Sequence, residues 1–133
     1  HMKFYLIFIL LSCSVSAQNK EPFSIEIRPR VLDNAKIIVN IEITNRLQQP
    51  IDYLEGFLSE YSSKRTLLSE KRVVLLYSYE PALQTGFSAT KTAKFDLGNQ
   101  KPSNFEFNIS KVRFSGNNRI FAWHKKAGFI RID

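Results

Sequence analysis

The alternation of apolar and polar residues with a period of two constrains the fold of this chain more than any other feature. Residues 37–44 read IIVNIEIT, and residues 23–28 and 104–109 repeat the same alternation. Successive side chains of a β-strand point to opposite faces of a sheet, so this pattern predicts strands with one buried face. No segment long enough for a stable helix has the apolar spacing of an amphipathic helix.

Turn-forming residues divide the chain into seven or eight such strands. The clearest turn signals are at Asp33-Asn34, Thr85-Gly86, Gly98–Pro102 and Gly116–Asn118. Gly and Asn accept the backbone conformations that tight turns require, and Pro fixes one of them. Short strands separated by regular turns are typical of sandwiches and barrels whose neighbouring strands run antiparallel.

Four segments depart from the regular alternation. Pro29 lacks the amide hydrogen of a strand ladder and therefore indicates an edge strand or a bulge. Gly56 suits a β-bulge, an extra residue after which the other set of alternate side chains points inward. Residues 62–72 are rich in charge and are interpreted as a connection, and residues 64–76 leave room for a helical turn. Residues 73–79 are compact, apolar and followed by a proline, so we expect a strand there.

The chain is therefore expected to be all-β, an antiparallel immunoglobulin-like β-sandwich of seven or eight strands. A small β-barrel is the alternative. If Trp123 points inward, Phe121 does so too, and His124 faces solvent. The predicted core consists of Ile25, Ile27, Ile37, Val39, Ile41, Ile43, Phe95, Phe107, Ile109, Phe114 and either Phe121 or Trp123.

Length and composition favour one domain, which we place at residues 18–133. The chain has 133 residues, a formal charge of +7 and a single Cys. One Cys allows no intrachain disulfide and no Cys-based zinc site. A domain of this length buries about two thirds of the surface of its unfolded chain, so it needs no metal to fold.

The N-terminus has the pattern of a secretory signal peptide at residues 1–17. His1 before Met2 is interpreted as a remnant of cloning, and Lys3 is followed by the apolar run 4–11 and by small residues up to Ala17. The run is shorter than the roughly 20 apolar residues of a membrane-spanning helix. We therefore expect the chain to be exported to the periplasm or the cell envelope.

Cys13 offers a second reading of the same segment. The residues Leu10 to Cys13 resemble a bacterial lipobox, in which cleavage leaves a lipid-carrying Cys at the N-terminus. On this reading Cys13 is the lipid attachment site of an outer-membrane lipoprotein, whereas cleavage after Ala17 removes it. Both readings leave a mature domain without Cys, which suits an oxidising compartment.

Two motifs resemble small bacterial secreted immunoglobulin-like domains of the FxLyD type. Residues 41–45 (IEITN) followed by 50–53 (PIDY) look like the strand, Asn, loop and strand that open such domains. Residues 109–116 (ISKVRFSG) followed by Trp123 look like the ending of related secreted domains, with Ser115 where those often have Asp. The resemblance implies an extracytoplasmic module without catalysis of its own, and it implies no site residues.

No motif for catalysis, metal binding or a cofactor is present. His124 is the one His of the natural chain, has no neighbouring nucleophile, and is interpreted as a surface residue at a strand end. Carboxylates lack metal-ligand spacing. The carboxylates of Glu55 with Glu60, or of Glu42 with Asp52, are expected to be solvated charges rather than a glycosidase pair. We expect a protein that is not an enzyme and takes no cofactor.

The excess of basic residues is the remaining clue to partners. Several Lys and Arg residues stand beside aromatic residues, and Tyr, Trp and Arg are frequent in interface hot spots. The candidate partner-binding surface comprises Tyr77, Tyr79, Arg119, Trp123, Lys125 and Lys126. We expect a non-enzymatic module that binds another envelope protein. The alternatives are a binder of anionic glycan or membrane surface and, third, a small enzyme or enzyme inhibitor; export argues against nucleic acid.

Overall fold

The computed structural model describes residues 21–33, 35–98 and 101–133. The predicted signal peptide at residues 1–17 and the predicted lipid site at Cys13 lie outside these ranges. Within them, no helix is long and apolar enough to cross a membrane. The strands are β1 (Phe23–Leu32), β2 (Lys36–Asn45), β3 (Ile51–Ser62), β4 (Leu67–Leu76), β5 (Ser88–Asp96), β6 (Pro102–Phe114), β7 (Phe121–His124) and β8 (Gly128–Arg131).

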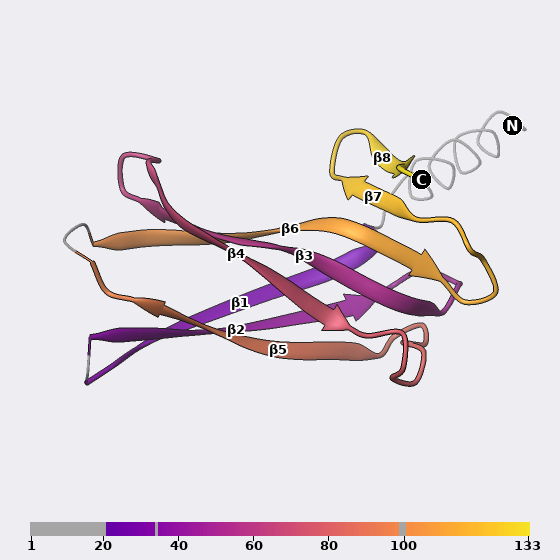
Figure 1. The fold of residues 1–133 in the computed structure, drawn as a ribbon, viewed down its shortest axis with the longest axis horizontal. Helices are drawn as coiled ribbons and strands as arrows, with labels where there is room; N and C mark the ends of the chain where they lie inside the picture. Colours follow the sequence, from indigo (N-terminus) through magenta and orange to yellow (C-terminus); the bar gives the residue numbers. More distant parts are fainter. Residues whose placement is uncertain (1–20, 34, 99–100) are drawn as a thin grey trace, which may run out of the picture.

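The eight strands form two antiparallel sheets that pack face to face (Figure 1). One sheet has the strand order β1-β2-β5, and the other has the order β4-β3-β6-β7-β8. The predicted β-sandwich is confirmed. The alternative of a small barrel is wrong, because the strands of the two sheets are not joined into one closed ladder in the described part of the chain.

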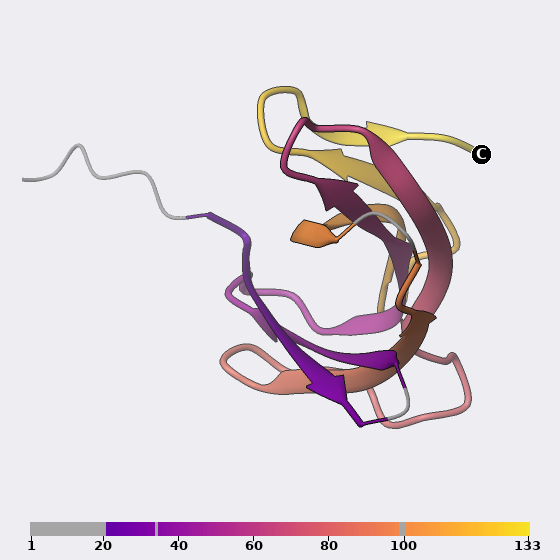
Figure 2. The same ribbon diagram turned by 90° about the vertical axis from the view of Figure 1, so that its left-hand side faces the viewer.

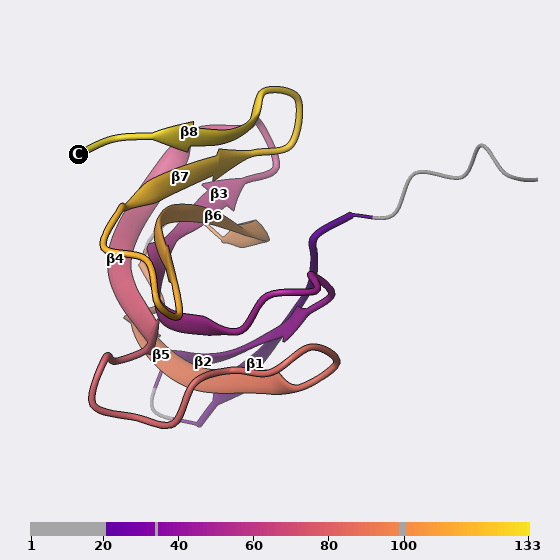
Figure 3. The same cartoon turned by 90° about the vertical axis from the view of Figure 1, so that its right-hand side faces the viewer.

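The two sides of the sandwich differ. On one side, which we call the closed side, the edge strands β4 and β5 lie next to each other (Figures 2 and 3). On the opposite side, the open side, edge strand β1 faces β6, and β7 and β8 extend the larger sheet beyond β6. Pro29 lies within β1, so the predicted edge strand is confirmed.

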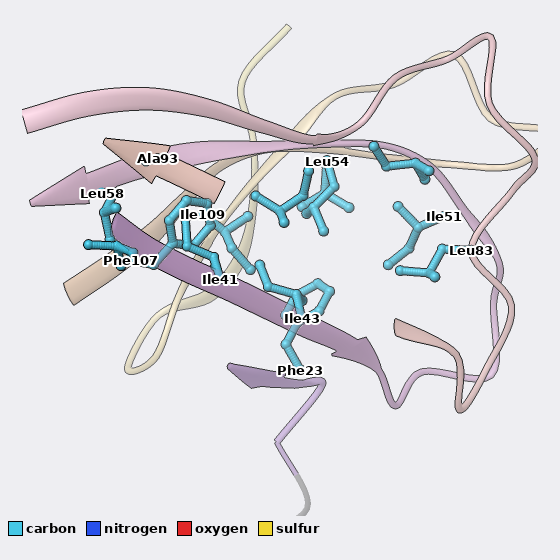
Figure 4. Close-up of a cluster of buried hydrophobic side chains, with 14 of the residues drawn as sticks. Phe23, Ile41, Ile43, Ile51, Leu54, Leu58, Leu83, Ala93, Phe107 and Ile109 are labelled. Atoms are coloured by element: carbon cyan, nitrogen blue, oxygen red, sulfur yellow. The ribbon is translucent and has the colours of Figure 1, made fainter. Parts of the chain in front are cut away.

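The core lies between the sheets (Figure 4). It follows the predicted alternation in β2, where every second side chain from Ile37 to Ile43 is buried. Phe95, Phe107, Ile109 and Phe114 are buried as predicted. Ile25 and Ile27 are only partly buried, because β1 is an edge strand on the open side. Sequence analysis missed several of the most buried side chains: Ile51, Leu54, Leu58, Leu75 and Val112.

Phe121 and Trp123 both pack against this core, rather than one of them alone. The ring of Trp123 meets Phe23 edge to face, with ring centroids 5.5 Å apart. This geometry is the one that aromatic pairs prefer. His124 is exposed, so the predicted link between the orientations of these three residues is confirmed.

Strand β3 is central in its sheet and carries the predicted bulge at Gly56. Its register shifts between Leu54 and Glu55 relative to β4, and between Glu55 and Gly56 relative to β6. A Cβ atom at Gly56 would overlap the carbonyl oxygen of Asn108 and the ring of Phe107. Only glycine fits where β6 passes this closely.

The expectation of a connection at residues 62–72, with a helical turn within residues 64–76, is wrong, because the strand β4 begins at Leu67 and continues to Leu76. Cross-strand polar contacts explain the difference: the hydroxyl of Ser59 donates to Glu70, and that of Ser69 donates to Glu60, each at 2.9 Å. Polar pairs across neighbouring strands stabilise a sheet without an apolar alternation in the edge strand.

Asn45 ends β2 and is buried beneath two loops. Its side-chain amide donates to the carbonyl oxygens of Gln49 (2.9 Å) and Leu83 (3.0 Å), and its side-chain oxygen accepts from the amide of Leu47 (2.9 Å). Its backbone amide donates to the carbonyl of Phe87 (2.9 Å). One side chain thus holds the loops that precede β3 and β5, which gives the Asn of the IEITN motif a structural role.

Candidate functional site

The candidate site begins with a strand whose outer edge is largely unpaired. β6 pairs with β3 along its whole length, from Pro102 to Phe114. On its other side it pairs with β7 only at Val112, opposite Phe121. Within the described residues, positions 102–111 of β6 therefore pair with a strand on one side only, and β7 lies near Ile109 without pairing to it. Such an edge presents backbone amides and carbonyls to any chain that lies beside it.

The inward faces beside this edge are apolar. We define the open-side groove by Ile25 and Ile27 of β1 and Phe105, Phe107 and Ile109 of β6. Two hollows lie along it. One of about 280 Å³ runs between Ile27 and Phe105, and one of about 590 Å³ lies between Ile25, Phe107 and Ile109 and extends to β7.

The closed side of the sandwich is built differently. There Lys71 of β4 holds its ammonium 5.1 Å from the ring centroid of Phe95, and Lys91 of β5 lies 5.7 Å from that of Tyr77. Cations over aromatic faces are favourable, and charged residues that point inward on edge strands prevent pairing with other chains. The open-side groove is lined mainly by apolar residues. Arg30 and Lys125 also line its two hollows, but among the described residues no Lys or Arg lies over an aromatic ring of the groove, so this edge is less protected.

Tyr77 and Tyr79 of the predicted partner surface lie in the turn after β4. Their rings stack with centroids 5.1 Å apart, and Tyr79 is 81% exposed. The amide of Tyr77 donates to the carboxylate of Glu80 at 3.0 Å, which fixes the turn. Tyr77 also lines a hollow of about 400 Å³ on the closed side with the cations Lys71, Arg72, Lys91 and Lys94.

The other four predicted residues lie elsewhere. Trp123 is in β7, and Lys125 and Lys126 form the turn to β8; these three line one hollow of about 700 Å³. Arg119 lies in the loop between β6 and β7, where its amide donates to the side chain of Asn117 at 3.0 Å. The structure thus places Tyr77 on the closed side and Trp123 on the open side, in separate hollows.

The expectation of solvated carboxylates is wrong for Glu55 and Glu60, which are 3% and 4% exposed. Both lie in the central strand β3, where neighbouring strands cover them on either side. They do not share a site, because Glu55 bonds to Arg72 and Glu60 accepts from Ser69. Asp52 accepts from Arg113 at 2.8 Å, and Glu42 lies 3.7 Å from Arg28.

Glu55 is the centre of a small polar network. Arg72 Nε donates to its Oε2 at 2.8 Å and a second guanidinium nitrogen donates to its Oε1 at 3.0 Å, while the hydroxyl of Tyr53 also donates to Oε1. The hydrogen bonds from Arg72 lower the pKa of Glu55, against the opposing effect of burial. Burial and the bond to Glu55 raise the pKa of Tyr53. This arrangement ties β4 to β3.

The described residues contain no group of three or more His, Cys, Asp or Glu that could hold a metal ion. The Nδ1 atom of His124 accepts from the amide of Lys126 at 3.1 Å, which fixes the turn between β7 and β8. The chemistry that the described site offers is therefore that of backbone edges, apolar surface and cations.

No family model matches the sequence, and no curated protein matches it. Two solved structures resemble the fold. IrmA from Escherichia coli is 7% identical, with a TM-score of 0.49 over 86% of each chain. The putative ApaA protein from Bordetella pertussis is 11% identical, with a TM-score of 0.45 over 83% of this chain and 85% of that one. At these values the likeness concerns the fold alone, and the resemblance to FxLyD-type domains stays a prediction.

The unpaired edge of β6 was missed by sequence reasoning. The alternation at residues 104–109 predicted the strand but not its neighbours. No sequence signal marks it, because the 13 residues of β6 and the four of β7 become neighbours only through the strand order.

Proposed function

We propose that this chain is a non-enzymatic, extracytoplasmic β-sandwich module that binds another protein. A strand of that partner protein is added to the sheet beside β6. One observation carries the proposal: among the described residues, positions 102–111 of β6 pair with no strand other than β3, and the surface beside them is a largely apolar groove. Peptides that add to a sheet edge gain affinity from main-chain hydrogen bonds and specificity from pockets for alternate side chains.

The added strand lies beside β6 in the position that β7 leaves after Phe121. Its inward side chains pack over Ile25 and Ile27, which are only partly buried in the free chain. A strand rises about 3.3 Å per residue, so positions 102–111 match a segment of about ten residues. Alternate residues of that segment should be apolar, because only one of its faces meets the groove.

A random peptide library displayed on phage tests the proposal with the full chain as bait. We expect the enriched peptides to carry apolar residues at every second position. Ile27→Lys should abolish their binding, since it places a cation in the groove as Lys71 does on the closed side. Thr90→Lys is the matched control, because it adds the same charge to β5, the other edge strand of that sheet.

Circular dichroism and thermal melting show whether each variant is folded. Ile27→Thr is the second variant if Ile27→Lys does not fold, because Thr keeps the branched Cβ that suits a strand while it removes apolar surface. Failure to enrich any peptide, or peptides that bind both variants as tightly as the unaltered chain, would overturn the proposal.

A further inference from the structure

We propose that the strand that binds to β6 carries a cluster of acidic residues at one end, and that these residues lie in the hollow beside Trp123. This inference rests on the proposed strand addition and specifies the chemistry of the partner. We define the Trp123 hollow by Arg46, Trp123, Lys125, Lys126 and Phe129.

The Trp123 hollow continues the open-side groove. The hollow between Ile25 and Ile109 and the Trp123 hollow share Glu21, Trp123 and Lys125 as lining residues. A chain that follows β6 past Ile109 therefore reaches Trp123, where β7 diverges from β6. Phe23 packs against Trp123 in the edge-to-face contact, so the indole ring is held in place at this end of the groove.

The charges of this hollow are unbalanced. Three cations, Arg46, Lys125 and Lys126, line it with a single carboxylate, that of Glu21. The carboxylate of Glu21 lies 3.6 Å from the ammonium of Lys125 and so offsets the charge of that one cation. Among the described residues, neither Arg46 nor Lys126 lies within 4.0 Å of a carboxylate oxygen. Complementary charge at the rim of an interface speeds association and fixes the register of the partner.

The turn that presents these cations is held in one conformation. The amides of Lys126 and Ala127 donate to Nδ1 of His124, at 3.1 and 3.4 Å. Gly128 closes the turn with a φ of 76°, which side chains other than that of glycine rarely adopt. Because the backbone is fixed, Lys126 stays at the end of the groove, where an acidic residue of the added strand would meet it.

The same phage selection tests this inference separately from the strand addition. Enriched peptides should combine the apolar alternation with two or more Asp or Glu residues at one end. An alternating peptide without acidic residues at either end, bound with undiminished affinity and still sensitive to Ile27→Lys, would overturn this inference and leave the proposed function standing. Absence of any peptide sensitive to Ile27→Lys would overturn both.

Charge reversal locates the acidic end. Arg46→Glu with Lys126→Glu should weaken binding of an acid-ended peptide about tenfold or more at low salt, and should improve binding of the same peptide with a lysine end. Lys64→Glu is the control, since Lys64 is an exposed residue of the turn between β3 and β4. If the double variant still prefers peptides with acidic ends, the inference is contradicted. It is also contradicted if the chain binds a second copy of itself through the groove and Ile27→Lys abolishes that self-association.

Discussion

The ammonium group of Lys71 lies over the ring of Phe95, 5.1 Å from its centroid, at the side where β4 and β5 meet. Lys91 takes the same position over Tyr77 nearby. On the opposite side, Ile27 and Phe105 face a hollow that Arg30 also lines, but no Lys or Arg of the described chain lies over the ring of Phe105. The side where β4 and β5 meet is thus better protected against added strands than the opposite side.

Removal of this protection should promote self-association. We expect the double variant Lys71→Leu with Lys91→Leu to form dimers at lower protein concentration than the unaltered chain. The reason is that the edge strands β4 and β5 then each lose a lysine that discourages pairing with another chain. Light scattering coupled to gel filtration measures this. Lys64→Leu, which exposes the same apolar side chain in a turn, should not change the oligomeric state; equal behaviour of the two variants would show that the rim lysines do not guard the edge.

The stability of the chain should depend on the ionised form of Glu55. Its pKa is lowered in the folded chain, so the stabilisation is present above the ordinary pKa of Glu, about 4.3, and is lost as the pH falls through the folded value. Glu55→Gln should cost about 1–3 kcal/mol at pH 7 and progressively less in acid. Denaturant titrations across pH measure the free energy of unfolding. A constant difference between the two proteins would contradict this account.

Gly56→Ala should destabilise the chain by about 1–3 kcal/mol, because the added methyl group overlaps Phe107 and the backbone of Asn108. Gly98→Ala is the matched control. A Cβ atom at Gly98 meets nothing within 4 Å, so we expect a change within about 0.5 kcal/mol. Thermal melting distinguishes the two; similar melting temperatures would mean that the bulge relaxes around the methyl group.

Asn45→Asp keeps the shape and the acceptor of the side chain but removes both donors. The carbonyl of Gln49 then loses the donor from Asn45, and that of Leu83 keeps only the backbone amide of Ile51, so we expect a loss in the free energy of unfolding of about 1–3 kcal/mol. Asn117→Asp is the control, because the side chain of Asn117 accepts a hydrogen bond from the amide of Arg119 through its oxygen, which Asp retains. If urea denaturation finds both variants equally stable, the bonds from Asn45 do not hold the loops.

Much of the fold could be predicted from the sequence because β2 and β6 have one buried and one solvent-facing side. Apolar and polar residues therefore alternate along these strands with a period of two. β4 could not be predicted in full, since it is an edge strand held by polar contacts from Ser69 and Arg72. Burial of Glu55 and Glu60 follows from the central position of β3, which depends on strand order and not on local pattern.

The candidate site was harder to predict. Residue type identified Trp123, Lys125 and Lys126, which line one hollow, but could not show that Tyr77 and Tyr79 belong to the opposite side. The unpaired edge of β6 consists of backbone groups, and these are the same in every sequence. It follows only from which strand lies next to which.

Amide hydrogen exchange of the full chain, with and without a selected peptide, tests the strand addition most directly. We predict that alternate amides within residues 103–111 exchange quickly in the free chain and slow by about tenfold or more when the peptide binds, because each gains a hydrogen bond. Amides of β5 on the closed side should not change. Protection confined to β4 or β5, or no protection in β6, would contradict the account.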